Sequence, residues 1–254
     1  MNARAGHGAR AASVAVVAVW VGLWALAVQR GWISQVFLAA PLDALHALAA
    51  GIGKGDWAHL AFATIERMAC GWLLACAAGL LLGALIGISP ALRAWLQPML
   101  EVLRPLPASA LMPVAIALMG LTPAMVLVVI AFGSVWPVLL ATVHGFANIE
   151  PRLEEVARVL RLSRTAFIVK IGLPAALPDA LAGMRLALTI SLILAVVGEM
   201  LASQPGLGQT ILLAARSFRS ADLFGGVMLL GLIGWASNAL VSLLERRALR
   251  WQQR

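Results

Sequence analysis

The sequence predicts an all-α membrane protein with six transmembrane helices and a cytoplasmic helix-turn-helix loop between the fourth and fifth spans. The prediction rests on the composition, on long charge-free stretches and on the placement of basic residues. Of the 254 residues, 62% are hydrophobic and only 12% are charged, whereas about 25% are charged in an ordinary soluble domain. Disordered chains are poor in hydrophobic residues. Lipid is therefore the expected solvent.

Three charge-free stretches are each long enough for a helix that crosses a hydrocarbon core of about 30 Å. They cover residues 11–29, 68–92 and 223–244. We expect these three stretches to form the first, second and sixth spans of a single domain, residues 1–254.

A longer charge-free stretch runs from Pro105 to Ile149 and exceeds the length of one crossing. It is broken by a turn-type cluster from Gly120 to Pro123. We therefore expect two spans here, at 105–120 and 123–145. The fifth span is expected at 180–202, although this segment includes Arg185 and Glu199.

The basic residues indicate how the spans are oriented. Of the 19 Lys and Arg residues, 14 lie at the termini, before the third span or in the fourth-to-fifth connection, and five lie on the other side. The positive-inside rule then places both termini and the loop at 150–179 in the cytoplasm. A cleaved signal peptide is the alternative for the N-terminus, but the apolar run exceeds the usual 7–15 residues, so an uncleaved first span is favoured.

No segment carries a recognisable catalytic, metal or nucleotide motif. The glycine-rich segment 51–56 lacks the spacing of a phosphate-binding loop, and the four histidines form no metal pattern. Cys70 and Cys76 are six residues apart in one apolar run and are assigned neither a disulfide nor a metal. We expect no enzymatic activity and no cofactor bound by this chain. The net charge of +8 is explained by topology rather than by binding to nucleic acid.

Small residues recur every four positions along the second span, a pattern that lets membrane helices approach closely. The stripe predicts a packing seam within the bundle or between subunits, and its members are Gly71, Ala75, Gly79, Gly83 and Gly87. The alternative is that glycine is simply common in membrane helices.

Two charged residues at the edges of spans are candidates for lining or gating a pathway. Glu199 is a carboxylate in a predominantly apolar span, where an ionised group must face a cavity, pair with a cation or lie at the interface. Arg104 precedes two prolines that break regular helix and favour a cavity-lining backbone. A structural role is the alternative for both.

The loop at 150–179 predicts two short helices. Pro151 suits the first helical turn, and Leu153, Val156 and Leu160 form an apolar face on an otherwise charged helix. Ser163 is a cap for a second short helix, which is expected to stop near Pro174 and Pro178. The exposed face needs a partner, unless it folds back on the bundle.

This loop resembles the E-A-A-x3-G-x9-I-x-L-P loop of ABC importer permease subunits. Glu155-Val156-Ala157, Arg161 and Ile171-Gly172-Leu173-Pro174 have the same spacing, but valine replaces the middle alanine and arginine replaces the glycine. Arg161 argues against a left-handed turn, because a side chain makes positive φ costly. The predicted ATPase-coupling residues are Glu155, Val156, Ala157, Leu160, Arg161, Ser163, Phe167, Ile171, Leu173 and Pro174.

Other segments resemble the nitrate, sulfonate and taurine branch of these permeases. They are Leu103-Arg104-Pro105-Leu106-Pro107 with Pro113, Gly198-Glu199-Met200-Leu201 and Gly206-Leu207-Gly208. The resemblance implies a bacterial inner-membrane protein that acts as a homodimer and imports a small anion. It also implies an external binding protein and two cytoplasmic ATPase subunits, which hold ATP and Mg²⁺. The alternative function is a secondary transporter or channel that works without an ATPase.

Overall fold

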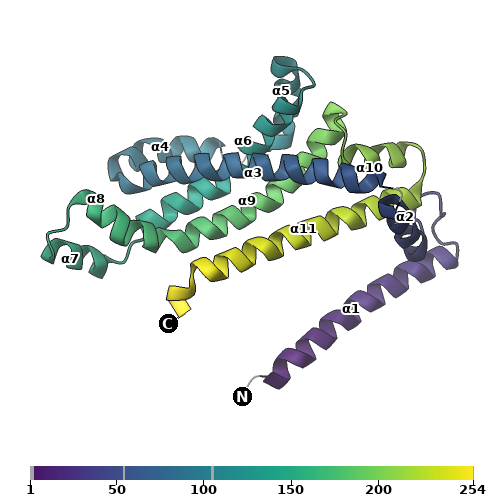
Figure 1. The fold of residues 1–254 in the computed structure, drawn as a ribbon, viewed down its shortest axis with the longest axis horizontal. Helices are drawn as coiled ribbons and strands as arrows, with labels where there is room; N and C mark the ends of the chain where they lie inside the picture. Colours follow the sequence, from purple (N-terminus) through teal and green to yellow (C-terminus); the bar gives the residue numbers. More distant parts are fainter. Residues whose placement is uncertain (1–2, 54, 104–105, 254) are drawn as a thin grey trace.

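The computed structural model describes residues 3–53, 55–103 and 106–253, and this part of the chain contains helices and turns but no strand (Figure 1). The longer helices are α1 (Ala3–Gln29), α2 (Pro41–Gly53), α3 (Asp56–Ile88), α4 (Pro90–Leu103), α6 (Pro123–Ala147), α9 (Leu173–Ala202), α10 (Leu207–Arg216) and α11 (Ser220–Ala248). The shorter elements are η1 (Ala108–Leu111), α5 (Met112–Met119), α7 (Pro151–Val159), α8 (Arg164–Phe167), the π-turn η2 (Ile168–Gly172) and η3 (Arg250–Gln253).

Four helices of the described chain are long and apolar enough to cross a membrane. They are α3, α6, the continuous helix from Arg164 to Ala202, and α11. A fifth crossing results if α4 and the segment Ala108–Met119 count as one broken span with a bend of 78°. In α1 the apolar part among the residues searched is the shorter segment Ala15–Gln29. The structure thus shows four or five candidate spans where the sequence predicts six.

The third predicted span, 105–120, differs most from the prediction. Instead of one long helix, the structure has η1 and α5, which together cover 12 residues from Ala108 to Met119. At about 1.5–2 Å per residue this segment is only about 20 Å long, too short to cross a bilayer alone. Its length is limited by Pro107 before η1, Pro113 in the first turn of α5 and Gly120 at φ +71°. The predicted break between Gly120 and Pro123 is confirmed, and Thr122 caps α6 by accepting the Met125 N–H (3.2 Å).

The helix that contains the fifth predicted span begins earlier than predicted, because it does not stop at Pro174 and Pro178. It continues from α8 through η2 into α9 without a break. In η2 the Leu173 N–H donates to the Ile168 carbonyl, five residues back. A π-turn adds one residue to a helical turn, and this one lies directly before Pro174, in the first turn of α9. The second short helix predicted for the loop at 150–179 is therefore the first turn of the continuous helix Arg164–Ala202.

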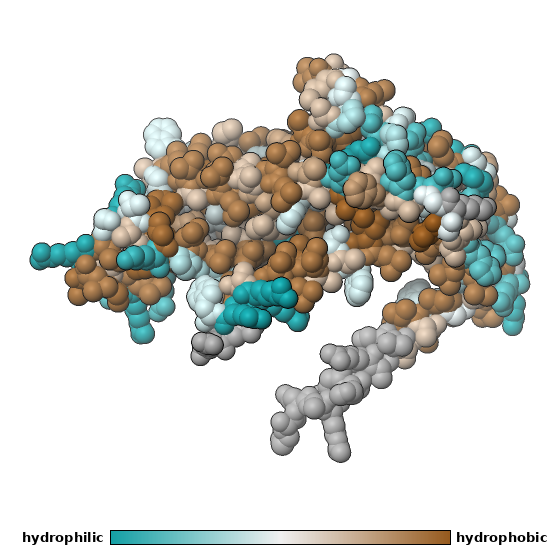
Figure 2. Space-filling view, in the orientation of Figure 1, coloured by the Kyte–Doolittle hydropathy of each residue, from teal (hydrophilic) through white to brown (hydrophobic). Residues whose placement is uncertain are grey.

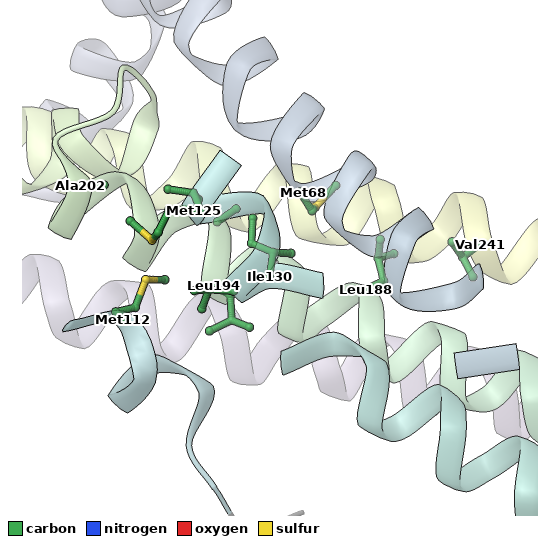
Figure 3. Close-up of a cluster of buried hydrophobic side chains, with 11 residues drawn as sticks. Met68, Met112, Met125, Ile130, Leu188, Leu194, Ala202 and Val241 are labelled. Carbon is green, nitrogen blue, oxygen red and sulfur yellow. The ribbon is translucent and has the colours of Figure 1, made fainter. Parts of the chain in front are cut away.

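The hydrophobic core lies where α3, α6 and α9 pack together, with α5 and α11 adding contacts at its ends (Figure 3). Met125 and Ile130 of α6 are fully buried between Met68 of α3 and Leu194 of α9, and Met112 of α5 packs against the same cluster. Outside this core the long flank of the bundle is apolar, and hydrophilic side chains gather near α7 and near α2 and α10 (Figure 2). This distribution is typical of a helical bundle whose flank is surrounded by lipid and whose two ends are exposed to water on either side of the membrane.

The glycine stripe of α3 packs against α6 of the same chain. A Cβ atom added to Gly71, Gly79, Gly83 or Gly87 would meet Ile130, Val138, Thr142 or Phe146, respectively. Each contact joins residues 59 positions apart, so the two helices run parallel and in register. The small residues therefore form a seam within the bundle, where side chains on α3 would force the two backbones apart.

Candidate functional site

The loop between α6 and α9 forms a helical hairpin that projects from one end of the bundle (Figure 1). Its first helix, α7, begins at Pro151, and its second, α8, is capped by Ser163, whose hydroxyl accepts the Ala166 N–H (3.2 Å). Between them lies a tight turn of four residues, 160–163. Because α8 continues into α9, the hairpin is joined rigidly to a membrane helix.

Arg161 adopts the left-handed conformation that its side chain disfavours, with φ +49°. The Leu162 N–H donates to the Ala157 carbonyl (3.0 Å) and the Arg161 N–H donates to the Arg158 carbonyl (3.1 Å). These two hydrogen bonds form the Schellman motif that ends many helices, usually with glycine at the left-handed position. The expectation that arginine would prevent such a turn is wrong, because the motif's hydrogen bonds hold the backbone in this conformation.

The apolar face of α7 is exposed and does not fold back on the bundle. Val156 is 49% exposed, Val159 is 81% exposed and Leu160 is 63% exposed. A cluster of exposed apolar side chains at the hydrophilic end of the bundle is typical of a protein interaction surface. The alternative in which this face packs on the bundle is therefore excluded for these residues.

The other predicted coupling residues divide between the surface and the interior of the hairpin. Ala157 is only 7% exposed and lies beside a hollow of about 560 Å³, which is lined by Ala157, Arg158, Arg161, Leu162 and Phe167. Glu155, Ser163 and Leu173 are exposed, whereas Phe167, Ile171 and Pro174 are half-buried. The hairpin thus offers exposed apolar side chains beside a shallow hollow with two arginines.

A groove of about 890 Å³ lies between α6 and α9 and is lined near one end by Ala108 and Ser109 of η1. One face of each long helix lines it, for example Trp136 and Leu140 on α6 and Leu186 and Ile190 on α9. The walls are mostly apolar. None of the groove-lining residues was predicted from the sequence to line a pathway, because a lining face and a lipid-facing face have the same apolar composition.

Glu199 lies outside this groove, in a hydrogen-bonded cluster that joins α3, α9 and α10. Its carboxylate is fully buried and accepts hydrogen bonds from the Thr64 hydroxyl (3.0 Å), the Arg67 guanidinium (2.8 Å) and the Gly208 N–H (2.9 Å). The Leu207 N–H donates to Thr64 Oγ1 (3.0 Å). We call these residues the Glu199 clamp: Thr64, Arg67, Glu199, Leu207 and Gly208.

The clamp explains why glycines flank the start of α10. A Cβ atom at Gly206 would collide with the Glu199 carboxyl group, and one at Gly208 would lie 3.1 Å from it. The first N–H groups of a helix have no acceptor within the helix. In α10 those of Leu207 and Gly208 donate to Thr64 on α3 and to Glu199 on α9. The positive end of the helix dipole also stabilises the negative charge of Glu199. Of the alternatives for Glu199, the structure supports the structural one.

Arg104 and Arg185 are two further charged residues at the edges of the predicted spans. Arg104 lies outside the described residues. Arg185, expected to disturb the fifth span, forms an ion pair with Glu245 of α11. The clamp residues Thr64 and Arg67 were missed, because nothing in the sequence links them to Glu199 more than 130 positions away.

Similarity to known proteins identifies the family. Residues 78–251 match the family described as the binding-protein-dependent transport system inner membrane component. The chain is 34% identical over 92% of its length to a protein named as an aliphatic sulfonates transport permease, SsuC, of Bacillus subtilis (strain 168), of which 85% is covered. It is also 34% identical over 76% of its length to the nitrate import permease protein NrtB of Leptolyngbya laminosa, of which 69% is covered.

A further relative and the fold of a solved structure agree with this assignment. The bicarbonate transport system permease protein CmpB of Synechococcus elongatus is 32% identical over 79% of this chain and 72% of its own length. A solved structure of an amino acid ABC transporter covers 79% of this chain and 97% of its own, with a TM-score of 0.63 at 16% identity, which shows a shared fold. The chain therefore belongs to the family of inner membrane components of binding-protein-dependent transport systems and is an ABC transporter permease.

Proposed function

We propose that two copies of this chain form the translocation pathway of an importer for a small anion, driven by ATP that a separate subunit hydrolyses. Membership of the family implies an ATP-binding subunit and a substrate-binding protein, and it decides against a secondary transporter or channel without an ATPase. The observation that carries the proposal is the exposed apolar face on the hairpin, at Val156, Val159 and Leu160.

The ATPase docks on the hairpin through the apolar face of α7. The segment from Glu150 to Arg185 has six basic and four acidic residues, so the docking surface is apolar at its centre and positive at its edge. A matching groove on the ATPase has an apolar pocket with acidic residues at its rim. The coupling residues 155–174 named above act in this contact, and ATP and Mg²⁺ are bound by the two ATPase copies.

The second permease copy covers the groove between α6 and α9. The lining side chains are mostly apolar but several, such as Leu186 (58% exposed) and Ile193 (56% exposed), lie uncovered in the isolated chain. A two-fold axis along the groove would bring the same face of two chains together. In this homodimer the same face of both copies lines the pathway and encloses it.

The chain lies in the inner membrane of a bacterium and crosses it six times, with α1 as the first span. Both of its termini are in the cytoplasm. This proposal is supported by the positive-inside bias. It is also supported by the course of α1 and α11, because the start of α1 and the end of α11 both lie away from α2 and α10 (Figure 1). The third span is formed by α4 together with η1 and α5, bent rather than straight.

The solute is an anion of the size of a sulfonate, nitrate or bicarbonate. The names of the three relatives refer to aliphatic sulfonates, nitrate and bicarbonate, which share a small, oxygen-rich, negatively charged group. Taurine belongs to the same chemical class. The external binding protein delivers the anion and makes most of the choice among these molecules.

Docking is tested by comparing Leu160→Asp with Arg164→Ala in the full transporter. Leu160 is an exposed apolar side chain of the docking face, at the C-terminal end of α7, and Arg164 is an exposed charge in α8. Central apolar contacts carry more binding energy than rim charges. We expect Leu160→Asp to reduce co-purification of the ATPase by at least about tenfold, and Arg164→Ala by less than about threefold.

The permease must still insert into the membrane in both variants, because the changes lie in the exposed hairpin. Membrane abundance and size-exclusion profile of the permease serve as controls. If Leu160→Asp retains both ATPase recruitment and ATP-dependent uptake of every tested anion, the hairpin is not the docking element and the proposal fails.

A further inference from the structure

The groove between α6 and α9 has ionisable side chains at only one end. Among its lining residues, which all belong to the described part of the chain, His144 and Asp179 are the ionisable ones. His144 lies in the last turn of α6 and Asp179 lies near the start of α9. Both therefore flank the hairpin, at the end that the proposed topology places in the cytoplasm.

The position of Asp179 along α9 corresponds to the inner mouth of the pathway. The last groove-lining residue on the same helix is Val197, 18 residues further on, which is about 27 Å along a helix axis. This length matches a hydrocarbon core of about 30 Å. The groove thus crosses the apolar layer, and Asp179 lies at its cytoplasmic edge.

Asp179 forms no side-chain interaction that would hold the fold together in the described part of the chain. Its side chain is half-buried, and it takes part in none of the ion pairs or side-chain hydrogen bonds among the described residues. The nearby Arg185 is paired with Glu245 of α11, and the groove is lined by its neighbours Gly183 and Leu186 instead. His144, on the facing helix, lies 2.9 Å from the side-chain nitrogen of Asn148.

We propose that Asp179 is a specificity-determining residue of the inner mouth, whose carboxylate repels the transported anion and so favours its release into the cytoplasm. The inference rests on the proposed function, because it requires an anionic solute and a pathway along this groove. In the homodimer the charge is present twice. A site that binds the solute weakly at the exit lets it leave and keeps anions already in the cytoplasm from entering the open pathway.

The size of the effect follows from Coulomb's law. Two like charges about 6 Å apart at the edge of a protein, where the effective dielectric constant lies between that of water and about 20, change an affinity by roughly threefold to a hundredfold. Removing the charge is therefore expected to strengthen binding of the anion from the cytoplasmic side by about tenfold. Inhibition of uptake by anion already inside measures this binding.

The experiment uses the complete transporter in proteoliposomes that enclose ATP and have the binding protein outside. The probes are ethanesulfonate, nitrate and bicarbonate, and each one that the wild type imports is used at rising lumenal concentrations. The lumenal anion concentration that halves uptake should be about tenfold lower for Asp179→Asn than for the wild type. The uptake of Asp179→Asn without lumenal anion is the reference for its own inhibition curve, and Asp179→Glu, which retains the charge, should be inhibited at the same lumenal concentration as the wild type.

The matched control is Asp43→Asn, which removes one exposed carboxylate on α2, away from the groove. It should leave lumenal inhibition unchanged.

If Asp179→Asn imports anion and has the same lumenal inhibition as the wild type, the inference is overturned while the proposed function stands. A shift in Asp179→Glu as large as that in Asp179→Asn would also overturn it, because side-chain shape would then matter and charge would not. A wild-type transporter that imports none of the three anions would contradict the proposed function and this inference together.

Discussion

A carboxylate within a membrane helix costs free energy unless its charge is satisfied, and Glu199 is satisfied by three donors. The Thr64 hydroxyl, the Arg67 guanidinium and the Gly208 N–H lie 2.8–3.0 Å from its two oxygens. Arg67 also donates to the Pro205 carbonyl (2.8 Å). At the residue scale the clamp therefore fixes α10 to α3 and α9, and it has no contact with the groove.

Replacing Glu199 by glutamine should destabilise the protein by about 3 kcal/mol. Glutamine has one oxygen where the carboxylate has two, so at least one of the three donors loses its acceptor. Arg67, whose side chain is 16% exposed, also loses the opposite charge. Thermal unfolding of the purified permease in detergent measures the loss.

The control for this change is Glu66→Gln. Glu66 is adjacent to Arg67 but exposed, so its replacement should alter the unfolding temperature little. Equal unfolding temperatures for Glu199→Gln and the wild type would return Glu199 to the group of pathway candidates.

At the scale of elements, the parallel packing of α3 and α6 depends on the absence of side chains along the glycine stripe. A Cβ atom at Gly83 would lie 2.8 Å from the Leu139 carbonyl oxygen and 2.7 Å from Thr142 Cβ. A backbone oxygen cannot move aside without moving its helix. The whole of α6 would therefore have to shift.

Gly83→Leu should destabilise the bundle by about 3 kcal/mol, at the upper end of the usual cost of overpacking. The result is measured as a lower unfolding temperature and a smaller yield of monodisperse permease. The matched control is Gly231→Leu on α11, where no atom lies within 4 Å of an added Cβ. A Gly83→Leu protein as stable as the Gly231→Leu protein would show that α3 and α6 do not approach each other as closely as described.

At the scale of the whole molecule, the proposed homodimer makes a prediction about the groove face. Leu186 lines the groove and is 58% exposed, whereas Leu81 on α3 is 68% exposed and lies away from it. Near a two-fold axis, equivalent residues of two chains come close together. A cysteine at position 186 should therefore form a disulfide between two copies, and one at position 81 should not.

The measurement is oxidation in native membranes followed by electrophoresis without reducing agent. Cys70 and Cys76 are first replaced by serine and alanine, so that the added thiol is the only one. If Leu186→Cys runs only as a monomer after oxidation, although the ATPase and the binding protein are present, this face does not form the permease dimer.

The sequence by itself determined that the chain is a helical membrane protein, where most spans lie, and that the hairpin resembles a coupling loop. These features depend on composition, on runs of apolar residues and on spacing within a few helical turns, which are local properties. The helix break before Pro123 and the cap at Ser163 were predictable for the same reason.

Only the tertiary structure decided which helices meet and what the isolated charges do. It paired Glu199 with Arg67, set the glycine stripe against α6 and placed Asp179 at the end of a groove. It also showed that Arg161 occupies a left-handed turn and that η2 carries the helix past Pro174. In an apolar chain every helical face has similar composition, so contacts between residues 59 or 132 positions apart leave no local pattern, and they are determined by how the helices pack.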